Sequence, residues 1–318
     1  MFSKFFFSLA LLICSVIANA QNYPSHTVKI IGPGAGSGTD ITARILAKSL
    51  NKLWEQSVII ENKPGAGGTV GISAVVNSPP DGYTLLAQSA TYVINPAVYK
   101  NLPYDVTKSL IEIDMIATSP YILVTASSSK IQSLDDFIKE AKNRSSDFTF
   151  SSAGVGSSTH LASEYLNQTT NIKALHIPYK STPEAMQDVI SGRVTYLMAP
   201  YETALPQIQS GKLRALGISS KTRVEGLPQV PTIAEQLNNN FEMNFWVGLW
   251  APMATPAPII KKLKEDVTRV LNDPETKSAF NTAGITVKSM GQTAFTKFVR
   301  EEITKYQSIA KIAGINPQ

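Results

Sequence analysis

Residues 27–40 read Thr-Val-Lys-Ile-Ile-Gly-Pro-Gly-Ala-Gly-Ser-Gly-Thr-Asp, and this stretch decides the predicted fold. The β-branched run at 27–31 predicts a strand, and the apolar spacing over 39–54 predicts a helix directly after it. Glycine lets the backbone approach a ligand closely, and the free amides at a helix start attract anions. Residues 32–40 therefore predict a carboxylate or phosphate cradle, with a tight turn that only packs helix on strand as the alternative.

Further β-rich and helical stretches alternate along the chain. This alternation predicts an α/β fold with mostly parallel sheets and helices on both faces. Two similar cycles, joined by an extended segment at 111–125, predict two lobes with a cleft between them. Strands are expected at 58–61, 83–88, 148–151, 174–177, 194–198 and 213–218, and the main helices at 70–77, 257–271, 274–283 and 292–313.

A second glycine-rich turn has the same predicted order of strand, turn and helix as the first. Residues 151–160 read Ser-Ser-Ala-Gly-Val-Gly-Ser-Ser-Thr-His, between a predicted strand and a predicted helix. Ser157 or Ser158 would cap the helix, and the free amides would then face the cleft, although capping alone also explains the pattern. Two such turns, one in each lobe, predict a two-sided anion clamp.

Two other loops are weaker candidates, and a third loop is interpreted as structural. Residues 89–91 (Ser-Ala-Thr) and 178–182 (Pro-Tyr-Lys-Ser-Thr) each follow a strand, so their hydroxyls are placed to contact a ligand or to cap a turn. Lys180 is more simply interpreted as a solvated surface lysine, because lysine is rarely buried. The turn at 64–68 (Pro-Gly-Ala-Gly-Gly) is interpreted as structural and is expected to face away from the cleft.

The first twenty residues have the pattern of a secretory signal peptide. Lys4 precedes an apolar run over 5–17, and Ala18-Asn19-Ala20 forms a small-x-small cleavage site. The run is shorter than the roughly 20 residues that a membrane span needs. We therefore expect cleavage after Ala20, a periplasmic location and a mature protein that does not span the membrane.

Composition excludes several classes of site. Cys14 is the only cysteine and lies in the signal, so the mature chain would have no disulfide, zinc-thiolate site or thiol nucleophile. The net charge of +5 is spread without long like-charge runs, which gives no indication of nucleic-acid binding. Neither a dinucleotide-binding fingerprint, a P-loop, a His-Glu-x-x-His pattern nor a Gly-x-Ser-x-Gly elbow is present. We expect no cofactor, no metal and no catalytic residue.

Several stretches together resemble the substrate-binding proteins of tripartite tricarboxylate transporters, also called Bug-type receptors. The similar stretches keep the family's order and cover nearly the whole mature chain. One departure is Met198-Ala199-Pro200-Tyr201, which lacks an acidic residue that is often found after that strand. The matching stretches are 34–40, 61–68, 80–86, 94–99, 152–161, 177–180, 211–216, 227–232 and 250–252.

The resemblance implies a two-lobed periplasmic-binding-protein (Venus-flytrap) fold without catalytic activity, in which one carboxylate is held between the lobes by amides and hydroxyls. Lobe 1 is expected to comprise 21–122 and 248–318, and lobe 2 to comprise 123–247. The predicted ligand-binding residues are Gly34, Ala35, Gly36, Ser37, Gly38, Thr39, Asp40, Ser89, Ala90, Thr91, Ala153, Gly154, Val155, Gly156, Ser157, Ser158, Thr159, His160 and Tyr179.

The implied function is a monomeric periplasmic receptor that closes around a small carboxylate and delivers it to the membrane subunits of a tripartite transporter. A first alternative is a sensor subunit that binds a similar ligand and signals to a membrane protein. A second alternative is an exported hydrolase that uses Ser157 or Ser158 as its nucleophile.

Overall fold

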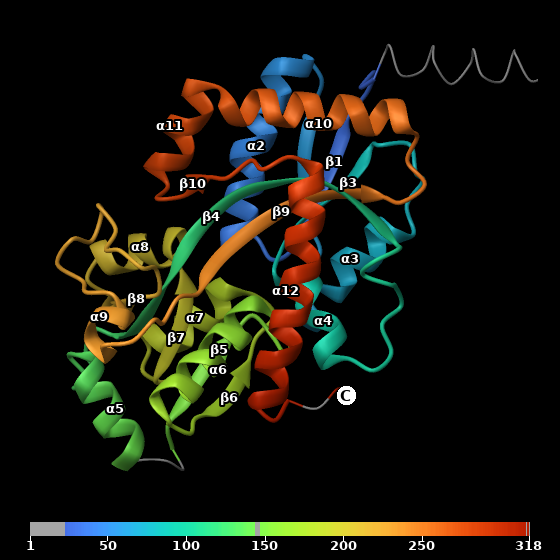
Figure 1. Ribbon diagram of the computed structural model, residues 1–318. Helices are drawn as coiled ribbons and strands as arrows, with labels where there is room; N and C mark the ends of the chain where they lie inside the picture. Colours follow the sequence, from blue (N-terminus) through green and yellow to red (C-terminus); the bar gives the residue numbers. More distant parts are fainter. Residues whose placement is uncertain (1–22, 144–146, 316, 318) are drawn as a thin grey trace, which may run out of the picture.

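The computed structural model describes residues 23–143, 147–315 and 317 (Figure 1). The predicted signal peptide and its cleavage site lie outside these residues. No helix in the described part of the chain combines the length and the apolar character that crossing a membrane requires.

The first sheet begins with three parallel strands, as the sequence predicts. The central strand β1 (Val28–Gly32) pairs in parallel with β2 (Val58–Asn62) on one side and with β3 (Thr84–Ser89) on the other. Beyond β3 the pairing turns antiparallel, first to β9 (Asn244–Pro252) and then to β4 (Leu110–Ala126). The short strand β10 (Thr286–Val287) pairs with the other edge of β4.

The 17-residue strand β4 belongs to two sheets (Figure 1). Residues Leu110–Pro120 pair with β9, whereas Tyr121–Ala126 pair with β7 (Tyr196–Pro200) and with β8 (Leu213–Ile218). The second sheet continues from β7 through β5 (Thr149–Ser152) to β6 (Leu175–Pro178), and these three strands are parallel. One continuous strand therefore connects the two halves of the molecule.

The prediction of a two-lobed α/β fold is confirmed, and the prediction of mostly parallel sheets is corrected. The parallel pairs are confined to β2-β1-β3 in the first sheet and β7-β5-β6 in the second. The strands β4 and β9, on which the chain crosses between the lobes, form antiparallel pairs, and so do β8 and β10 with β4. The expected lobe boundaries at 122/123 and 247/248 fall within β4 and β9, and they stay a prediction.

Helices cover both sheets. In lobe 1, α10 (Ala257–Asn272) and α11 (Pro274–Thr282) pack on α2 (Gly38–Trp54). The long C-terminal helix α12 (Gln292–Ile312) contacts β4, α4 (Thr91–Val98) and α6 (Ser158–Thr170), so it packs against elements of both lobes. The remaining helices are η1 (Ala66–Gly68), α3 (Thr69–Val76), α5 (Leu134–Asn143), α7 (Thr182–Ile190), α8 (Tyr201–Gln209) and α9 (Ile233–Leu237).

Buried aromatic clusters fix the helices on the sheets. In lobe 1 the ring of Trp250 lies 5.1 Å from Tyr92 and 5.3 Å from Phe295, which ties β9 to α4 and α12. In lobe 2 Phe137 packs edge-on against Tyr196 at 4.8 Å, which ties α5 to β7. Because such rings bury large apolar areas, these contacts hold the helices firmly on the sheets that carry the site.

Candidate functional site

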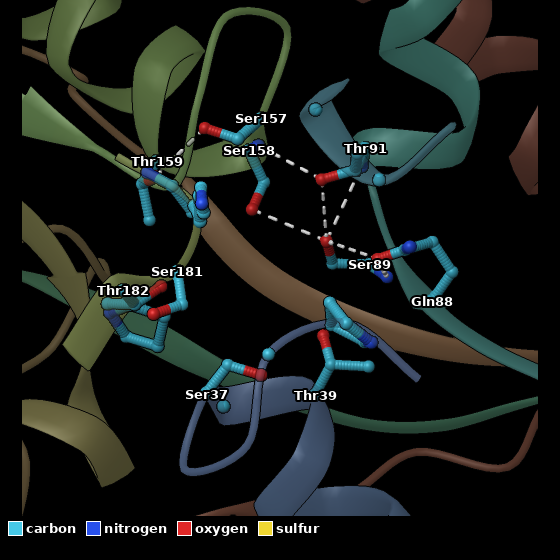
Figure 2. Close-up of a pocket in the computed structure, with 18 of the residues that line it drawn as sticks. Ser37, Thr39, Gln88, Ser89, Thr91, Ser157, Ser158, Thr159, Ser181 and Thr182 are labelled. Atoms are coloured by element: carbon cyan, nitrogen blue, oxygen red, sulfur yellow. Dashed lines mark hydrogen bonds between the residues drawn. The ribbon is translucent and has the colours of Figure 1, made fainter. Parts of the chain in front are cut away.

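A polar cavity of about 40 Å³ lies between the lobes, and helix N-termini surround it (Figure 2). Six helices start at its wall: α2, α3 and α4 from lobe 1, and α6, α7 and α8 from lobe 2. The lining residues are Pro33, Gly34, Ser37, Gly38, Thr39, Gly65, Gly67, Gly68, Gln88, Ser89, Thr91, Ala153, Ser157, Ser158, Thr159, Lys180, Ser181, Thr182, Pro200 and Phe245.

The loop before α2 forms one wall of the cavity. Ser37 is the N-cap of α2, and its hydroxyl accepts a hydrogen bond from the Asp40 amide at 3.3 Å. Gly36 turns the chain at φ +72°, a backbone angle that favours glycine. This geometry places the first amides of α2 at the cavity, as the sequence predicts for this loop.

Asp40 organises this loop with its buried carboxylate. Oδ2 accepts from the Gly36 amide at 2.8 Å and from Arg44 Nε at 2.9 Å, and Oδ1 accepts from Asn62 Nδ2 at 2.8 Å. Asp40 does not line the cavity. Its carboxylate therefore holds the loop in place from behind, while neighbouring residues face the cavity.

We expect Asp40→Asn to lower the free energy of unfolding by about 1.5–3 kcal/mol, the usual range for hydrogen bonds to a charged group. An amide supplies one acceptor oxygen, so at least one of the three donors would then face an N–H group. Urea denaturation of the variant measures the loss. The control is Asp135→Asn, which removes an exposed carboxylate from the first turn of α5. Unchanged stability combined with lost ligand binding would instead make Asp40 a ligand contact.

The loop before α6 forms the opposite wall. Ser157 caps α6 by accepting from the His160 amide at 3.2 Å, and the Ala153 amide donates to Thr159 Oγ1 at 3.0 Å. Gly154 adopts φ +113°, so the turn depends on glycine in the same way as the first loop. The two predicted cradles thus have matching capped helix starts on opposite sides of one cavity.

Hydroxyl groups connect the two walls directly (Figure 2). The Ser158 amide donates to Thr91 Oγ1 at 3.1 Å, and Ser89 Oγ donates to Ser158 Oγ at 3.4 Å. Ser89 and Thr91 belong to lobe 1 and Ser158 to lobe 2, so the lobes are in contact at this edge. Farther out, the Tyr99 hydroxyl donates to the Val155 carbonyl at 2.8 Å and adds another contact between the lobes.

The electrostatics of the cavity favour an anion. In the described part of the chain, no hydrogen-bond acceptor is found for the amides of Gly38, Thr39, Thr159 and Thr182, which lie in the first turns of α2, α6 and α7. Each helix start carries a partial positive charge of about half an elementary charge. Among the described residues that line the cavity, Lys180 is the one lysine or arginine. Helix dipoles and amides therefore supply most of the positive potential.

Glycines allow the lobes to meet around the cavity. A Cβ atom added to Gly34 would lie 2.5 Å from Ser181 Cβ, and one added to Gly38 would overlap Glu202 Oε1. A Cβ on Gly67 would overlap the Val155 carbonyl oxygen. In each case a glycine of lobe 1 faces a residue of lobe 2, so a larger side chain would hold the lobes apart.

The structure divides the predicted ligand-binding residues into two groups. Ten line the cavity: Gly34, Ser37, Gly38, Thr39, Ser89, Thr91, Ala153, Ser157, Ser158 and Thr159. The others lie beside or behind it: Ala35, Gly36, Asp40, Ala90, Gly154, Val155, Gly156, His160 and Tyr179. The Tyr179 hydroxyl donates to Asp188 Oδ2 at 2.5 Å, away from the cavity lining, so it is engaged within lobe 2. Contact with a ligand stays a prediction for all of these residues.

Sequence reasoning missed part of the wall. The turn at 64–68, expected to face away from the cleft, places Gly65, Gly67 and Gly68 in the cavity lining. It does so because η1 and α3 follow β2, whose end lies beside the end of β1. Lys180 is exposed, as expected, but it also lines the cavity.

The histidines do not form a catalytic pair with Ser157 or Ser158. The His160 and His176 rings stack at 4.0 Å, and burial lowers the pKa of His160 to about 3 and that of His176 to about 4. His160 Nδ1 accepts from the Gly156 amide at 3.3 Å. Two other serines lie beside a histidine ring: Ser152, which is fully buried, is 2.6 Å from His176 Nε2, and Ser25 Oγ is 3.4 Å from His26 Nδ1. This geometry gives no support to the hydrolase alternative.

Comparison with known proteins identifies the family. The family model described as the tripartite tricarboxylate transporter family receptor matches residues 42–315. The chain belongs to this receptor family. Among curated relatives, BugT of Bordetella pertussis is 32% identical over 299 residues, which cover 93% of this chain and 92% of BugT.

Solved structures of similar proteins agree with this assignment. An R. palustris protein with adipate is 27% identical, with a TM-score of 0.89 over 93% of this receptor and 100% of that chain. MatC from Rhodopseudomonas palustris with bound malate is 27% identical, with a TM-score of 0.85 over 90% of this receptor and 99% of that chain. The receptor family and the periplasmic-binding-protein fold predicted from the sequence are both confirmed.

Proposed function

We propose that this receptor captures a small dicarboxylate between its lobes in the periplasm and delivers it to the membrane subunits of a tripartite transporter. The observation that carries the proposal is the ring of six helix N-termini around one cavity. Such ends bind carboxylates through backbone amides and the helix dipole without requiring an arginine. Malate and adipate in the related structures belong to the same chemical class.

The size of the cavity suggests how the ligand lies. On this measure of volume a water molecule needs about 10–15 Å³, so a cavity of about 40 Å³ holds a carboxylate group and little more. A neighbouring hollow of about 580 Å³ shares Gly65, Gly67 and Lys180 with the cavity. We therefore place one carboxylate against the free amides and the second toward Lys180.

Binding of both lobes to one carboxylate would favour the closed arrangement, because only that arrangement brings α2 and α6 to the same group. The Thr39 hydroxyl and the free amides of Gly38 and Thr39 are available on one wall, and the free amide of Thr159 is available on the other. Lobe closure in response to the ligand is then what the membrane subunits would recognise.

Thermal unfolding with dicarboxylates tests this function. A ligand at 100 times its Kd stabilises the folded state by about 2.7 kcal/mol, so we expect malate or adipate to raise the Tm of ligand-free protein by several degrees. The control ligand is 1,6-hexanediol, which has the chain length of adipate without its charges. If no dicarboxylate of four to six carbons raises the Tm, carboxylate capture is refuted.

A further inference from the structure

The carboxyl group of Glu202 lies directly behind the wall of the cavity. Glu202 is in the first turn of α8 and is only 4% exposed. Its Oε2 accepts a hydrogen bond from Ser119 Oγ on β4 at 2.7 Å. Its Oε1 is buried, and no hydrogen-bond partner is found for it among the described residues. A buried carboxyl oxygen without a partner is costly, which indicates a use for this group.

The free oxygen of Glu202 lies against the start of α2. A Cβ on Gly38 would overlap Oε1 and would lie 3.0 Å from the Phe245 ring, and both Gly38 and Phe245 line the cavity. The amides of Gly38 and Thr39 at this helix start are the groups proposed to hold the ligand. The Glu202 carboxyl and a bound carboxylate would therefore share the N-terminus of one helix.

No basic side chain neutralises Glu202, since none of the ion pairs found among the described residues involves it. Burial raises the pKa of Glu202 to about 7, against the opposing effects of its own backbone amide and of the Ser119 hydrogen bond. The strand β9, which carries Phe245, contains no ionisable side chain. The elements that pack against α8 carry the following titratable or charged groups: Asp40, Arg44, Lys48 and Lys52 on α2, Glu112, Asp114 and Tyr121 on β4, Tyr196 on β7 and Arg214 on β8, with Tyr201 on α8 itself.

The charged groups among these neighbours are engaged elsewhere or face solvent. Asp40 and Arg44 are paired with each other at 2.9 Å, and Lys52 pairs with Glu275 at 2.6 Å. Lys48 is exposed, and Arg214 donates to carbonyls of residues 127–131. The carboxylates of β4 accept hydrogen bonds from the segment 289–296 at the far end of that strand.

The tyrosines bring no charge at physiological pH. Burial raises the pKa of Tyr121, of Tyr196 and of Tyr201 above the ordinary value of 10, so all three stay neutral below it. An anion at the start of α2 would then be the principal charge that Glu202 meets.

We propose that Glu202 takes up a proton from solvent when an anionic ligand occupies the cavity, so that ligand capture is coupled to protonation of this carboxyl. The inference rests on the proposed function, because it needs a carboxylate at the start of α2. Two carboxylates that share a site cannot easily both be ionised. The affinity for the ligand is therefore greatest below about pH 7 and falls by up to about tenfold for each pH unit above it.

Isothermal titration calorimetry with malate at pH 6.5, 7.5 and 8.5 tests the coupling. Each titration is run in two buffers that differ in ionisation enthalpy, so that the number of protons taken up is measured directly. For the wild type we expect weaker binding at pH 8.5 than at 7.5, with uptake of up to one proton. For Glu202→Gln we expect a Kd that is independent of pH and no proton uptake, because glutamine keeps the Ser119 hydrogen bond but does not titrate.

The matched control is Glu184→Gln, which removes an exposed carboxylate at the hollow beside the cavity. It is expected to change the Kd by the same factor at every pH. His160 and His176, with pKa values lowered by burial to about 3 and about 4, stay neutral over this range in all variants.

Two results would overturn the inference while leaving capture intact: a wild-type Kd that does not depend on pH, or a Glu202→Gln variant that keeps the wild-type slope and proton uptake. Absence of binding by malate and by adipate at all three pH values would instead refute the proposed function. The two failures are therefore distinguishable.

Discussion

Gly34→Ala should weaken dicarboxylate binding by roughly 5- to 150-fold while leaving the stability of the ligand-free protein nearly unchanged. The added Cβ would lie 2.5 Å from Ser181 Cβ across the seam between the lobes. Overpacking of this kind costs about 1–3 kcal/mol, and about 1.4 kcal/mol corresponds to a tenfold change in Kd. The backbone of Gly34 is not left-handed, so alanine is tolerated as long as the lobes are apart. Calorimetric titration with malate or adipate measures the loss.

The control for this variant lies two residues away. Gly32→Ala adds the same methyl group, but its Cβ would meet no atom closer than 3.9 Å, which is ordinary van der Waals contact. We expect Gly32→Ala to bind ligand as the wild type does. Equal Kd values for Gly34→Ala and the wild type would contradict the conclusion that the lobes close around these glycines.

A double variant distinguishes a clash of the new methyl group with Ser181 from a disturbance of the loop that contains Gly34. Ser181→Gly removes the atom that the new methyl group would meet, so Gly34→Ala combined with Ser181→Gly should recover much of the affinity. Ser181 also caps α7 by accepting from the Glu184 amide at 3.4 Å. Replacing a cap by glycine costs only a few tenths of a kcal/mol, so the single variant is a usable reference. Failure of the double variant to recover binding would mean that the alanine perturbs the loop itself.

The two loops on opposite walls were predictable because their chemistry is local in sequence. In each, a strand passes through glycines into a helix whose N-cap serine lies within four residues of the turn, at Ser37 and Ser157. The hydroxyl of an N-cap serine accepts from the amide three residues later, as Ser37 does from Asp40 and Ser157 from His160, so these hydrogen bonds follow from the local sequence alone. The fold class, the helix starts and half of the residues that line the cavity could therefore be predicted from short-range patterns.

What could not be predicted depends on contacts between distant parts of the chain. The turn at 64–68 reaches the cavity only because β2 lies beside β1, so that their carboxyl ends meet at one edge of the sheet. Asp40 was predicted as a ligand contact because it follows the glycines, yet Asn62 and Arg44 turn its carboxylate away from the cavity. The sequence of β4 likewise does not predict that two sheets share this strand, since apolar residues dominate both of its halves.

Glu202 shows the same limit most clearly. In sequence it is an acidic residue in the first turn of a helix, a position that the helix dipole favours and that usually faces solvent. Only the packing of α8 against α2 and β4 buries it.

Glu202→Gln should make the ligand-free protein more stable than the wild type at pH 8, by up to about 3 kcal/mol for the arrangement in which α2 covers Glu202, and nearly equal to it at pH 4.5. Burial raises the pKa of Glu202 from 4.5 to about 7 in the folded protein. Because this pKa is higher in the folded state than in the unfolded state, the folded state binds the proton more tightly. The free energy of unfolding of the wild type therefore falls as the pH rises from 4.5 to 7, and the loss is complete above pH 7. Each pKa unit corresponds to about 1.4 kcal/mol.

Urea denaturation of both proteins at pH 4.5, 6 and 8, without ligand, measures this difference. The variant retains a side-chain oxygen for the Ser119 hydroxyl, so the comparison isolates the ionisation of the carboxyl. A stability difference that does not change with pH would show that Glu202 does not titrate with a raised pKa. A difference that grows with pH would show that the wild type keeps, behind its cavity wall, a carboxyl that destabilises the empty protein at neutral pH. Because a proton taken up with the ligand relieves that destabilisation, the same group would contribute to holding the receptor closed only when it is loaded.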